Sequence, residues 1–116
     1  MNLTTTPWAA SFFVRNILGV FMAYYLIIDA EILDHDKYAR YVVAVTSVVE
    51  KFGGRYLVRG GEVEPFAGEY DGNRQVVIEF ESKYQARAFW DSSEYAVTKT
   101  LREGASRGSA LGVEGV

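Results

Sequence analysis

The chain has 116 residues, of which 49% are apolar and 15% aromatic, and this suits one compact domain because domains cluster at about 100–150 residues. A formal net charge of −3 and a pI near 5.1 offer no basic surface of the kind that displaces counterions from nucleic acid, so we expect no nucleic-acid partner. The absence of cysteine excludes disulfides and thiolate chemistry and fits a reducing compartment, so we expect a cytoplasmic protein.

Residues 1–21 differ in character from the rest. Thr4-Thr5-Thr6-Pro7 is typical of a loop, and no acidic residue occurs before Asp29. The uncharged stretch from Asn16 to Ile28 is shorter than the roughly 18 residues that a membrane-spanning helix needs. We therefore expect an N-terminal extension outside the core, followed by a single domain over residues 22–116. A targeting or membrane-surface peptide is the alternative for the extension.

The first predicted strand spans residues 23–32, where aromatic and β-branched side chains form a nearly continuous apolar run. Such a run is typical of a strand that is covered on both faces. Asp34 suits the N-cap of the helix that follows. Apolar residues then recur at spacings of three and four, which predicts one buried helix face made of Tyr38, Tyr41, Val42, Val45, Val48, Val49 and Phe52.

The stretch from Gly53 to Gly61 changes the chain from helix to strand. Gly53 falls where the helical pattern stops, a position that favours a residue without Cβ. The alternation from Arg55 to Arg59 then predicts a second strand with both arginines on one face. Residues 62–73 have the composition of turns, and the alternation that resumes over residues 74–80 predicts a third strand.

Ser82 and Gln85 fit a capping box, so a helix is expected to start near Lys83. A second short helix is expected over residues 94–103, and a turn over residues 104–109 leads into a last strand at about 110–116. The order β-α-β-β-α-β predicts an α+β fold of the ferredoxin-like type, an antiparallel sheet with helices on one face.

This arrangement leaves the other face of the sheet uncovered. The first strand is apolar on both sides, and exposure of the second side would create a patch larger than soluble monomers usually tolerate. We expect a second copy of the chain to cover it, which makes the protein a homodimer joined through the sheet face.

Several separated stretches resemble a known family: Gly-Gly-Arg-Tyr-Leu-Val-Arg-Gly-Gly at 53–61, Val-Val-Ile-Glu-Phe at 76–80, Ala-Arg-Ala-Phe-Trp-Asp-Ser-Ser-Glu-Tyr at 86–95 and a closing Val-Glu-Gly. From residue 22 onward the chain resembles the domain of unknown function 1330 family, within the dimeric α/β-barrel superfamily. The resemblance implies two ferredoxin-like sheets that face each other across a dimer and close a barrel. Superfamily relatives include cofactor-independent monooxygenases and haem-degrading enzymes, but the family itself has no established reaction. The chain departs from the family in its N-terminal extension and at residues 33–36, where family members often carry a proline.

A polar cluster is expected on the sheet face turned away from the helices, which would line the barrel. Alternation places Tyr25 and Asp29 of the first strand there, together with Arg55, Arg59 and Glu79, if Tyr24, Leu26 and Ile28 point to the helices. The catalytic candidates are Arg59, Glu79 and Asp29. The predicted ligand-binding residues, two of them at the rim, are Tyr25, Arg55, Arg59, Glu79, Trp90 and Tyr95.

Two interpretations of this cluster stay open. In the first, an anionic or carbonyl ligand lies against Arg59 with Glu79 or Asp29 as base, in a small-molecule binding protein or metal-independent enzyme. In the second, the charges form a salt-bridge network that fixes dimer register in a non-catalytic module. A cavity of roughly 300 Å³ or more lined by these groups favours the first, and a cavity filled by side chains favours the second.

Other chemistry has little support in the sequence. The lone His35 stands at a helix start, and metal sites usually need a cluster of ligands, so we expect neither a metal nor another cofactor. The glycine pairs lack the spacing and the Lys-Ser/Thr ending of a phosphate loop. Tyr38 and Tyr41 are expected to pack in the core, although a hydroxyl can reach a cavity from that stripe.

Overall fold

The computed structural model describes residues 22–116, and the expected N-terminal extension lies outside these residues. No helix in the described part is both long and apolar enough to cross a membrane. The elements are β1 (Tyr24–Ile32), α2 (His35–Lys51), β2 (Arg55–Arg59), β3 (Arg74–Phe80), α3 (Lys83–Trp90), α4 (Ser93–Lys99), the 3-10 helix η2 (Thr100–Arg102) and β4 (Ser106–Glu114).

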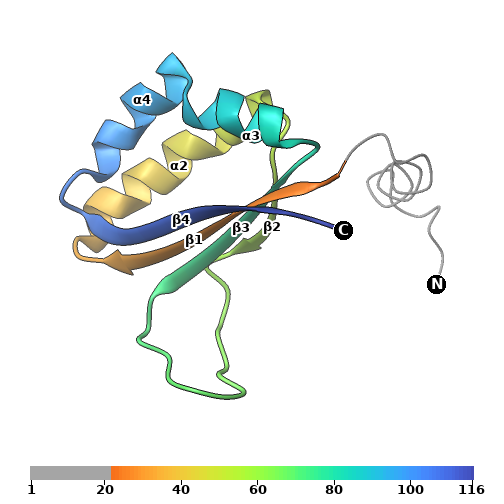
Figure 1. Cartoon of the computed structure of the whole chain (residues 1–116). Coiled ribbons are helices and arrows are strands. Elements are labelled where there is room, and N and C mark those ends of the chain that lie inside the picture. The colour runs from red at the N-terminus through yellow and green to blue at the C-terminus, as the bar shows by residue number, and fades with distance from the viewer. Residues whose placement is uncertain (1–21) are drawn as a thin grey trace, which may run out of the picture.

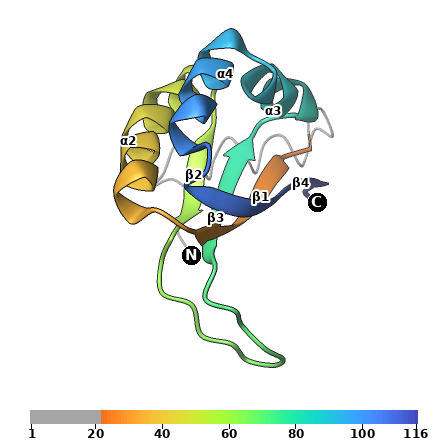
Figure 2. The same ribbon diagram turned by 90° about the vertical axis from the view of Figure 1, so that its left-hand side faces the viewer.

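The strands form one sheet in the order β2-β3-β1-β4, and each neighbouring pair is antiparallel. Helices α2, α3 and α4 lie together on one face of this sheet (Figures 1 and 2). The predicted α+β, ferredoxin-like fold is therefore confirmed.

Register around β1 decides which side chains reach the helices. Leu26 pairs with Ile78 on β3 and with Gly112 on β4, and both Leu26 and Ile78 are buried. Because strand side chains alternate between faces, the even-numbered residues of β1 and β3 face the helices, which for β1 is the orientation assumed from the sequence. They form the core together with side chains of the helices, namely Tyr38, Tyr41, Val45, Val49, Ala86, Phe89 and Tyr95.

The predicted helix ends are also present. The Asp34 carboxylate accepts a hydrogen bond from the backbone N–H of Lys37 at 3.0 Å, and Gly53 ends α2 with a φ of +81°. The Ser82 hydroxyl caps α3 by accepting from the backbone N–H of Gln85. The Gln85 side chain completes the turn by accepting from the backbone N–H of Glu81, one residue before the N-cap.

Strand β4 begins at Ser106, earlier than the expected residue 110. Gly108 lies opposite Ala30 in the β1–β4 ladder, and a Cβ at this position would lie 1.9 Å from the carbonyl oxygen of Asp29. Gly108, which falls in the expected turn, is therefore a residue that lets β4 approach β1 closely.

A β-bulge in β2 overturns one prediction about the site. Arg55 pairs with Glu79, but the register shifts between Tyr56 and Val58, so that Arg59 pairs with Val76. The extra residue at the bulge turns the β2 side chains that follow it to the opposite face of the sheet. Placing Arg59 on the same face as Glu79, and coupling the two charges, was therefore wrong: Arg59 lies on the helix side. The same shift places Val58 opposite Val77, on the face turned away from the helices.

The turn between α2 and β2 generates a stability prediction. A Cβ at Gly54 would lie 2.7 Å from Val49 Cγ1 and 2.8 Å from a ring carbon of Phe80, whereas a Cβ at Gly61 meets nothing within 4 Å. We expect Gly54→Ala to lower the free energy of unfolding by about 1–3 kcal/mol through overpacking, and Gly61→Ala to change it by less than about 0.5 kcal/mol. Urea denaturation of both variants measures this, and equal stabilities would contradict the packing described here.

Candidate functional site

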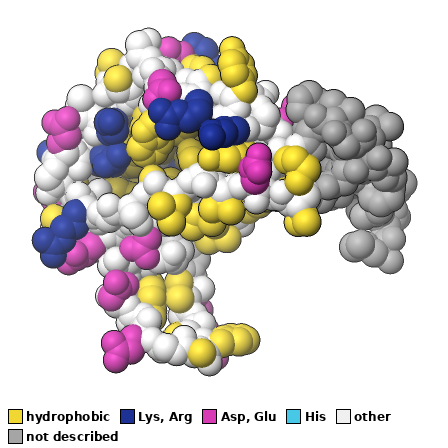
Figure 3. All heavy atoms as spheres, in the orientation of Figure 1, with side chains coloured by type: hydrophobic (Ala, Val, Ile, Leu, Met, Phe, Trp, Pro, Cys, Tyr) yellow, Lys and Arg dark blue, Asp and Glu magenta, His cyan; other side chains and the backbone are white. Residues whose placement is uncertain are grey.

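A pocket of about 260 Å³ lies between the helical layer and the sheet. Figure 3 shows it as a hollow with hydrophobic side chains inside and Lys and Arg side chains along its upper rim. One wall comes from α2 and the ends of α3, α4 and η2, and the floor comes from the strands. Its apolar lining is formed by Ile28, Ala30, Val42, Val45, Val76, Ile78, Phe89, Trp90 and Ala110.

The pocket exists because β4 carries small residues on its helix side. Gly108, Ala110 and Gly112 pair with Ala30, Ile28 and Leu26, so all three lie on the face turned toward the helices. At Gly112 the space is taken by Tyr24, whose hydroxyl would lie 2.3 Å from a Cβ there. Above Gly108 and Ala110 no large side chain rises from β4, and the space stays open.

A hydrogen-bonded group of two tyrosines and an arginine forms the polar end of the pocket. The hydroxyls of Tyr41 and Tyr95 are buried and lie 3.0 Å apart. Arg102 donates to the Tyr95 hydroxyl at 3.4 Å, and its guanidinium lies 5.5 Å from the centre of the Tyr41 ring. This group presents O–H and N–H donors to the pocket from three different elements, α2, α4 and η2.

Arg74, the first residue of β3, adds a second cation. Its guanidinium lies 5.9 Å from the centre of the Tyr38 ring, and its buried Nε atom has no hydrogen-bond partner among residues 22–116. A buried donor without an acceptor costs about 1–3 kcal/mol. The position therefore favours an acceptor group in the pocket.

Arg59 supplies a third cation, which the bulge turns toward α2. Its guanidinium lies 4.2 Å from the centre of the Tyr56 ring. It also donates to the carbonyl oxygen of Val42 at 2.9 Å and to the hydroxyl of Thr46. These contacts fix the side chain at the pocket wall.

Negative charge does not balance these arginines. Within the described chain none of Arg59, Arg74 and Arg102 forms an ion pair, while a fourth lining residue, Arg107, pairs with Glu31 at 2.7 Å. The acidic residue in the lining is Asp29, and both of its carboxylate oxygens accept hydrogen bonds, from Asn73 at 2.6 Å and from Gln75 at 2.8 Å. The pocket therefore has a mostly apolar lining bordered by arginines whose positive charge is not balanced by carboxylates of the described chain.

Burial and hydrogen bonding set the protonation states in this region. Burial raises the pKa of Tyr38, Tyr41 and Tyr56, and for Tyr41 the neighbouring Tyr95 raises it further. The hydrogen bonds from Gln75 and Asn73 lower the pKa of Asp29. At neutral pH the tyrosines are hydroxyl donors, and Asp29 is an ionised acceptor that is already occupied.

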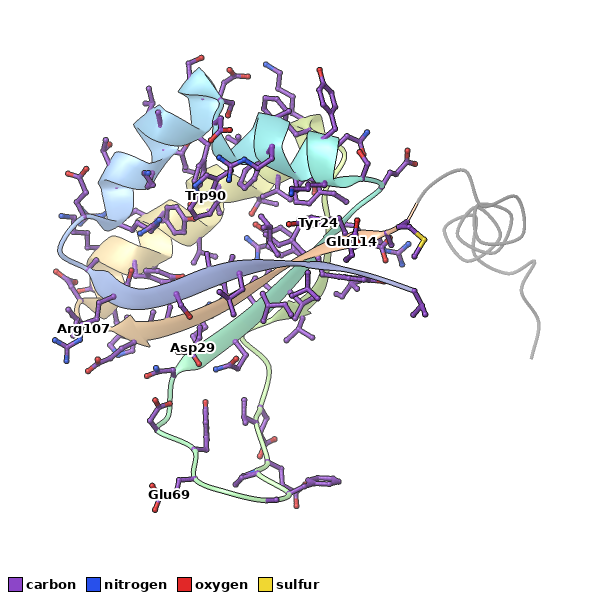
Figure 4. All side chains as sticks on the ribbon, in the orientation of Figure 1. Tyr24, Asp29, Glu69, Trp90, Arg107 and Glu114 are labelled. Atoms are coloured by element: carbon purple, nitrogen blue, oxygen red, sulfur yellow. The ribbon has the colours of Figure 1, made fainter. Side chains whose placement is uncertain are left out.

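The sheet divides the predicted site residues into two groups. Arg59, Trp90 and Tyr95 line the pocket, whereas Tyr25, Arg55 and Glu79 lie on the opposite face, where Glu79 pairs with both of the other two. Asp29 borders the pocket, but its side chain lies on the sheet side away from Trp90 (Figure 4). Glu79 is only 3% exposed, which is unusual for a carboxylate.

Sequence reasoning missed three arginines of the pocket lining, Arg74, Arg102 and Arg107, and it assigned Tyr38 and Tyr41 to the core, where they lie while also lining the pocket. Arg74 has the same parity as the buried Val76 and Ile78, so alternation along β3 would have identified it. Tyr38 and Tyr41 belong to the predicted stripe of α2. Arg102 has no such signal, because it lies in a short helical turn after α4.

Metal binding has no visible site in this part of the chain. Among residues 22–116 no group of three His, Cys, Asp or Glu side chains lies close enough to hold a metal ion. His35 is exposed at the first position of α2.

The sequence model of the family described as "Domain of unknown function (DUF1330)" matches residues 23–116. The chain belongs to the DUF1330 family. No protein of curated function has a significantly similar sequence.

Solved structures resemble this DUF1330 protein in fold. The crystal structure of RPA0582, a protein of unknown function from Rhodopseudomonas palustris, is similar with a TM-score of 0.69 and 13% identity, over 99% of this chain and 97% of that one. A structure of methylated RPA0582 has a TM-score of 0.63 and 14% identity, over 99% and 95% of the two chains. At these identities the likeness supports the fold alone.

The raised tyrosine pKa values predict alkaline destabilisation. Above about pH 10 the unfolded chain loses tyrosine protons that the folded chain keeps, so the folded state binds more protons and the free energy of unfolding falls as pH rises. The slope is up to about 1.4 kcal/mol per pH unit for each buried tyrosine, and the term is constant below about pH 9. Urea denaturation between pH 8 and 11 measures it.

Tyr41→Phe tests the cause. We expect this variant to lose stability less steeply above pH 10 than the wild type, because one retained proton is gone. Tyr84→Phe is the matched control, since Tyr84 is 83% exposed. A wild-type slope in Tyr41→Phe would show that the buried hydroxyl is not the source.

Proposed function

We propose that this DUF1330 protein binds a small organic anion, such as a carboxylate, in the pocket between the helices and the sheet. The observation that carries the proposal is the set of three arginines, Arg59, Arg74 and Arg102, which border an apolar pocket and have no carboxylate partner among the described residues. Unbalanced positive charge in a partly desolvated site favours an anion, because water screens the attraction less there.

Size and lining favour a compact ligand with an apolar body. Small-molecule pockets span about 300–1,000 Å³ and combine mostly apolar walls with a few placed polar groups. At about 260 Å³ this pocket lies just below that range. An aromatic or short branched acid would place its ring or chain against Trp90, Phe89 and Ile78 and its carboxylate toward Arg102 and the Tyr95 hydroxyl.

The same groups support binding more strongly than proton abstraction. A general base near pH 7 needs an accessible acceptor with a suitable pKa. The described lining offers tyrosine hydroxyls with raised pKa values and an Asp29 carboxylate whose oxygens are occupied. Should chemistry occur, these donors would stabilise negative charge on a bound oxygen rather than remove a proton.

We also propose that the protein is a homodimer joined through the uncovered sheet face. Apolar side chains gather on this face, from Ile27 at its centre to the neighbouring Val58, Val77, Leu111 and Val113, and four of these five are exposed. Helices cover the opposite face (Figure 2). The buried Glu79 opposite Arg55 supports the interpretation that charges on this face serve assembly.

The lack of cysteine supports a reducing compartment such as the cytoplasm.

Isothermal titration with benzoate and benzamide tests the ligand class, because the two probes share a shape and differ in charge. We expect benzoate to bind more tightly. Arg102→Met should weaken benzoate binding about 10–100-fold, since a hydrogen bond to a charged group contributes about 1.5–3 kcal/mol, while benzamide binding changes less than about threefold. Arg87→Met is the control, because Arg87 pairs with Asp91 on the surface outside the pocket.

The variant Ala110→Leu tests whether the probes bind in this pocket or elsewhere on the protein. A larger side chain at this β4 position fills the cavity, so we expect loss of both probes with little loss of stability. Benzoate binding that survives Ala110→Leu, or that is insensitive to Arg102→Met, would place the anion elsewhere and contradict the proposal.

Sedimentation equilibrium tests the homodimer. We expect a mass of twice 13.0 kDa at micromolar concentration. Leu111→Lys should raise the dimer dissociation constant at least about tenfold, because it buries a charge in the apolar face. Val43→Lys, at an exposed position on α2, should not. A folded wild-type monomer at micromolar concentration would contradict this assembly.

A further inference from the structure

Residues 60–73, which connect β2 to β3, form an arm that leaves the body of the protein. Both ribbon views show it on the side of the sheet opposite to the helices (Figures 1 and 2). Gly60 is still tied to the sheet, since its N–H donates to the carbonyl oxygen of Gln75 at 2.8 Å. Beyond Gly60, no hydrogen bond or ion pair joins residues 61–69 to the rest of the described chain. The sheet therefore holds the arm at Gly60, and residues 61–69 extend away from the body of the protein.

The tip of the arm carries an aromatic side chain in the open. Phe66 is 95% exposed, and it lies in a segment without helix or strand that buries no side chains of its own. Large aromatic residues contribute strongly to interfaces because they bury much apolar area with few rotatable bonds. Phe66 therefore suits a contact with another surface better than a free position in water.

Charge on the arm is entirely negative. It holds Glu62, Glu64, Glu69 and Asp71 and no lysine or arginine, so the rest of the chain carries 12 basic and 11 acidic residues. Figure 4 shows Glu69 far from the body. The pocket region, with Arg59, Arg74, Arg102 and Arg107 in its lining, carries the complementary charge.

The reach of the arm matches the thickness of a second copy. Seven extended residues from Gly60 to Phe66 span about 20 Å at roughly 3.3 Å per residue. Two sheets packed face to face lie about 10 Å apart. An arm that leaves one sheet toward the uncovered face therefore extends past the edge of a partner's sheet and ends at the level of the partner's helical layer, to which Arg102 of η2 belongs.

We propose that the acidic arm, residues 60–73, extends along a second copy of this chain, with Phe66 packed against the partner's helical layer. The inference rests on the homodimer proposed above and adds a second contact to it. Because the arm begins between Arg59 and Arg74, both of which border the pocket, each pocket is linked through its own arm to the other protomer.

Photo-crosslinking tests this on the full chain. Phe66→Cys introduces the sole thiol of the protein, since the native sequence has no cysteine, and a benzophenone maleimide attached to it reacts with whatever lies beside the tip. Protein labelled with nitrogen-15 is unfolded, mixed with unlabelled protein and refolded, illuminated and analysed by mass spectrometry. Val43→Cys, on the outer surface of α2, is the control.

We expect crosslinked peptides that combine labelled and unlabelled chains from position 66 and few from position 43. A second measurement uses Glu64→Lys together with Glu69→Lys, for which we expect the dimer dissociation constant to rise at least about tenfold. Crosslinks confined to one chain, or none, in a protein that still sediments as a dimer would overturn the role of the arm and leave the sheet-face dimer standing. A monomer by sedimentation would overturn both.

Discussion

Strand β1 is hydrogen-bonded on both sides, to β3 and to β4, and its register decides on which side of the sheet each side chain lies. The even-numbered residues of β1 close the hydrophobic core beneath the helices, and the odd-numbered ones form the uncovered face. The same register sets Gly108 and Ala110 under the helical layer, which leaves the pocket open. The pocket, the core and the proposed interface therefore all depend on one antiparallel alignment. A one-residue slip of β1 would turn its core side chains to the uncovered face and its outer side chains to the helices.

The elements were predictable from the sequence because their signals are local. Asp34 and Ser82 cap helices, Gly53 ends one, and the alternation in β1 and β3 places their side chains on the correct faces. The site was less predictable because one residue in β2 changes its geometry. Alternation assumes a regular ladder, and the bulge after Tyr56 breaks it, so Arg59 faces α2 while Arg55 remains beside Glu79. Arg102 joins Tyr41 and Tyr95 through tertiary packing, which no spacing in the sequence reveals.

The sequence offers a single polar cluster for ligand binding and for assembly, but in the fold the two roles fall to different surfaces, the pocket and the uncovered sheet face. The pocket holds cations, tyrosine hydroxyls and apolar walls, a combination that suits an organic anion. The other face holds Arg55 opposite the buried Glu79 among exposed apolar side chains, a combination that suits assembly. The sequence leaves a binding and a structural interpretation open for one site, and the fold allows both, on opposite sides of the same sheet.

A crystal structure of the protein soaked with 4-iodobenzoate would show whether the pocket between the helices and the sheet binds an organic anion, because the anomalous signal of iodine locates the ligand without assumptions about its pose. We expect an iodine peak between α2 and the sheet, near Trp90, with the carboxylate within hydrogen-bond distance of Arg102. An iodine peak on the uncovered sheet face near Arg55, or an empty pocket in a protein that binds the acid in solution, would contradict anion binding in this pocket.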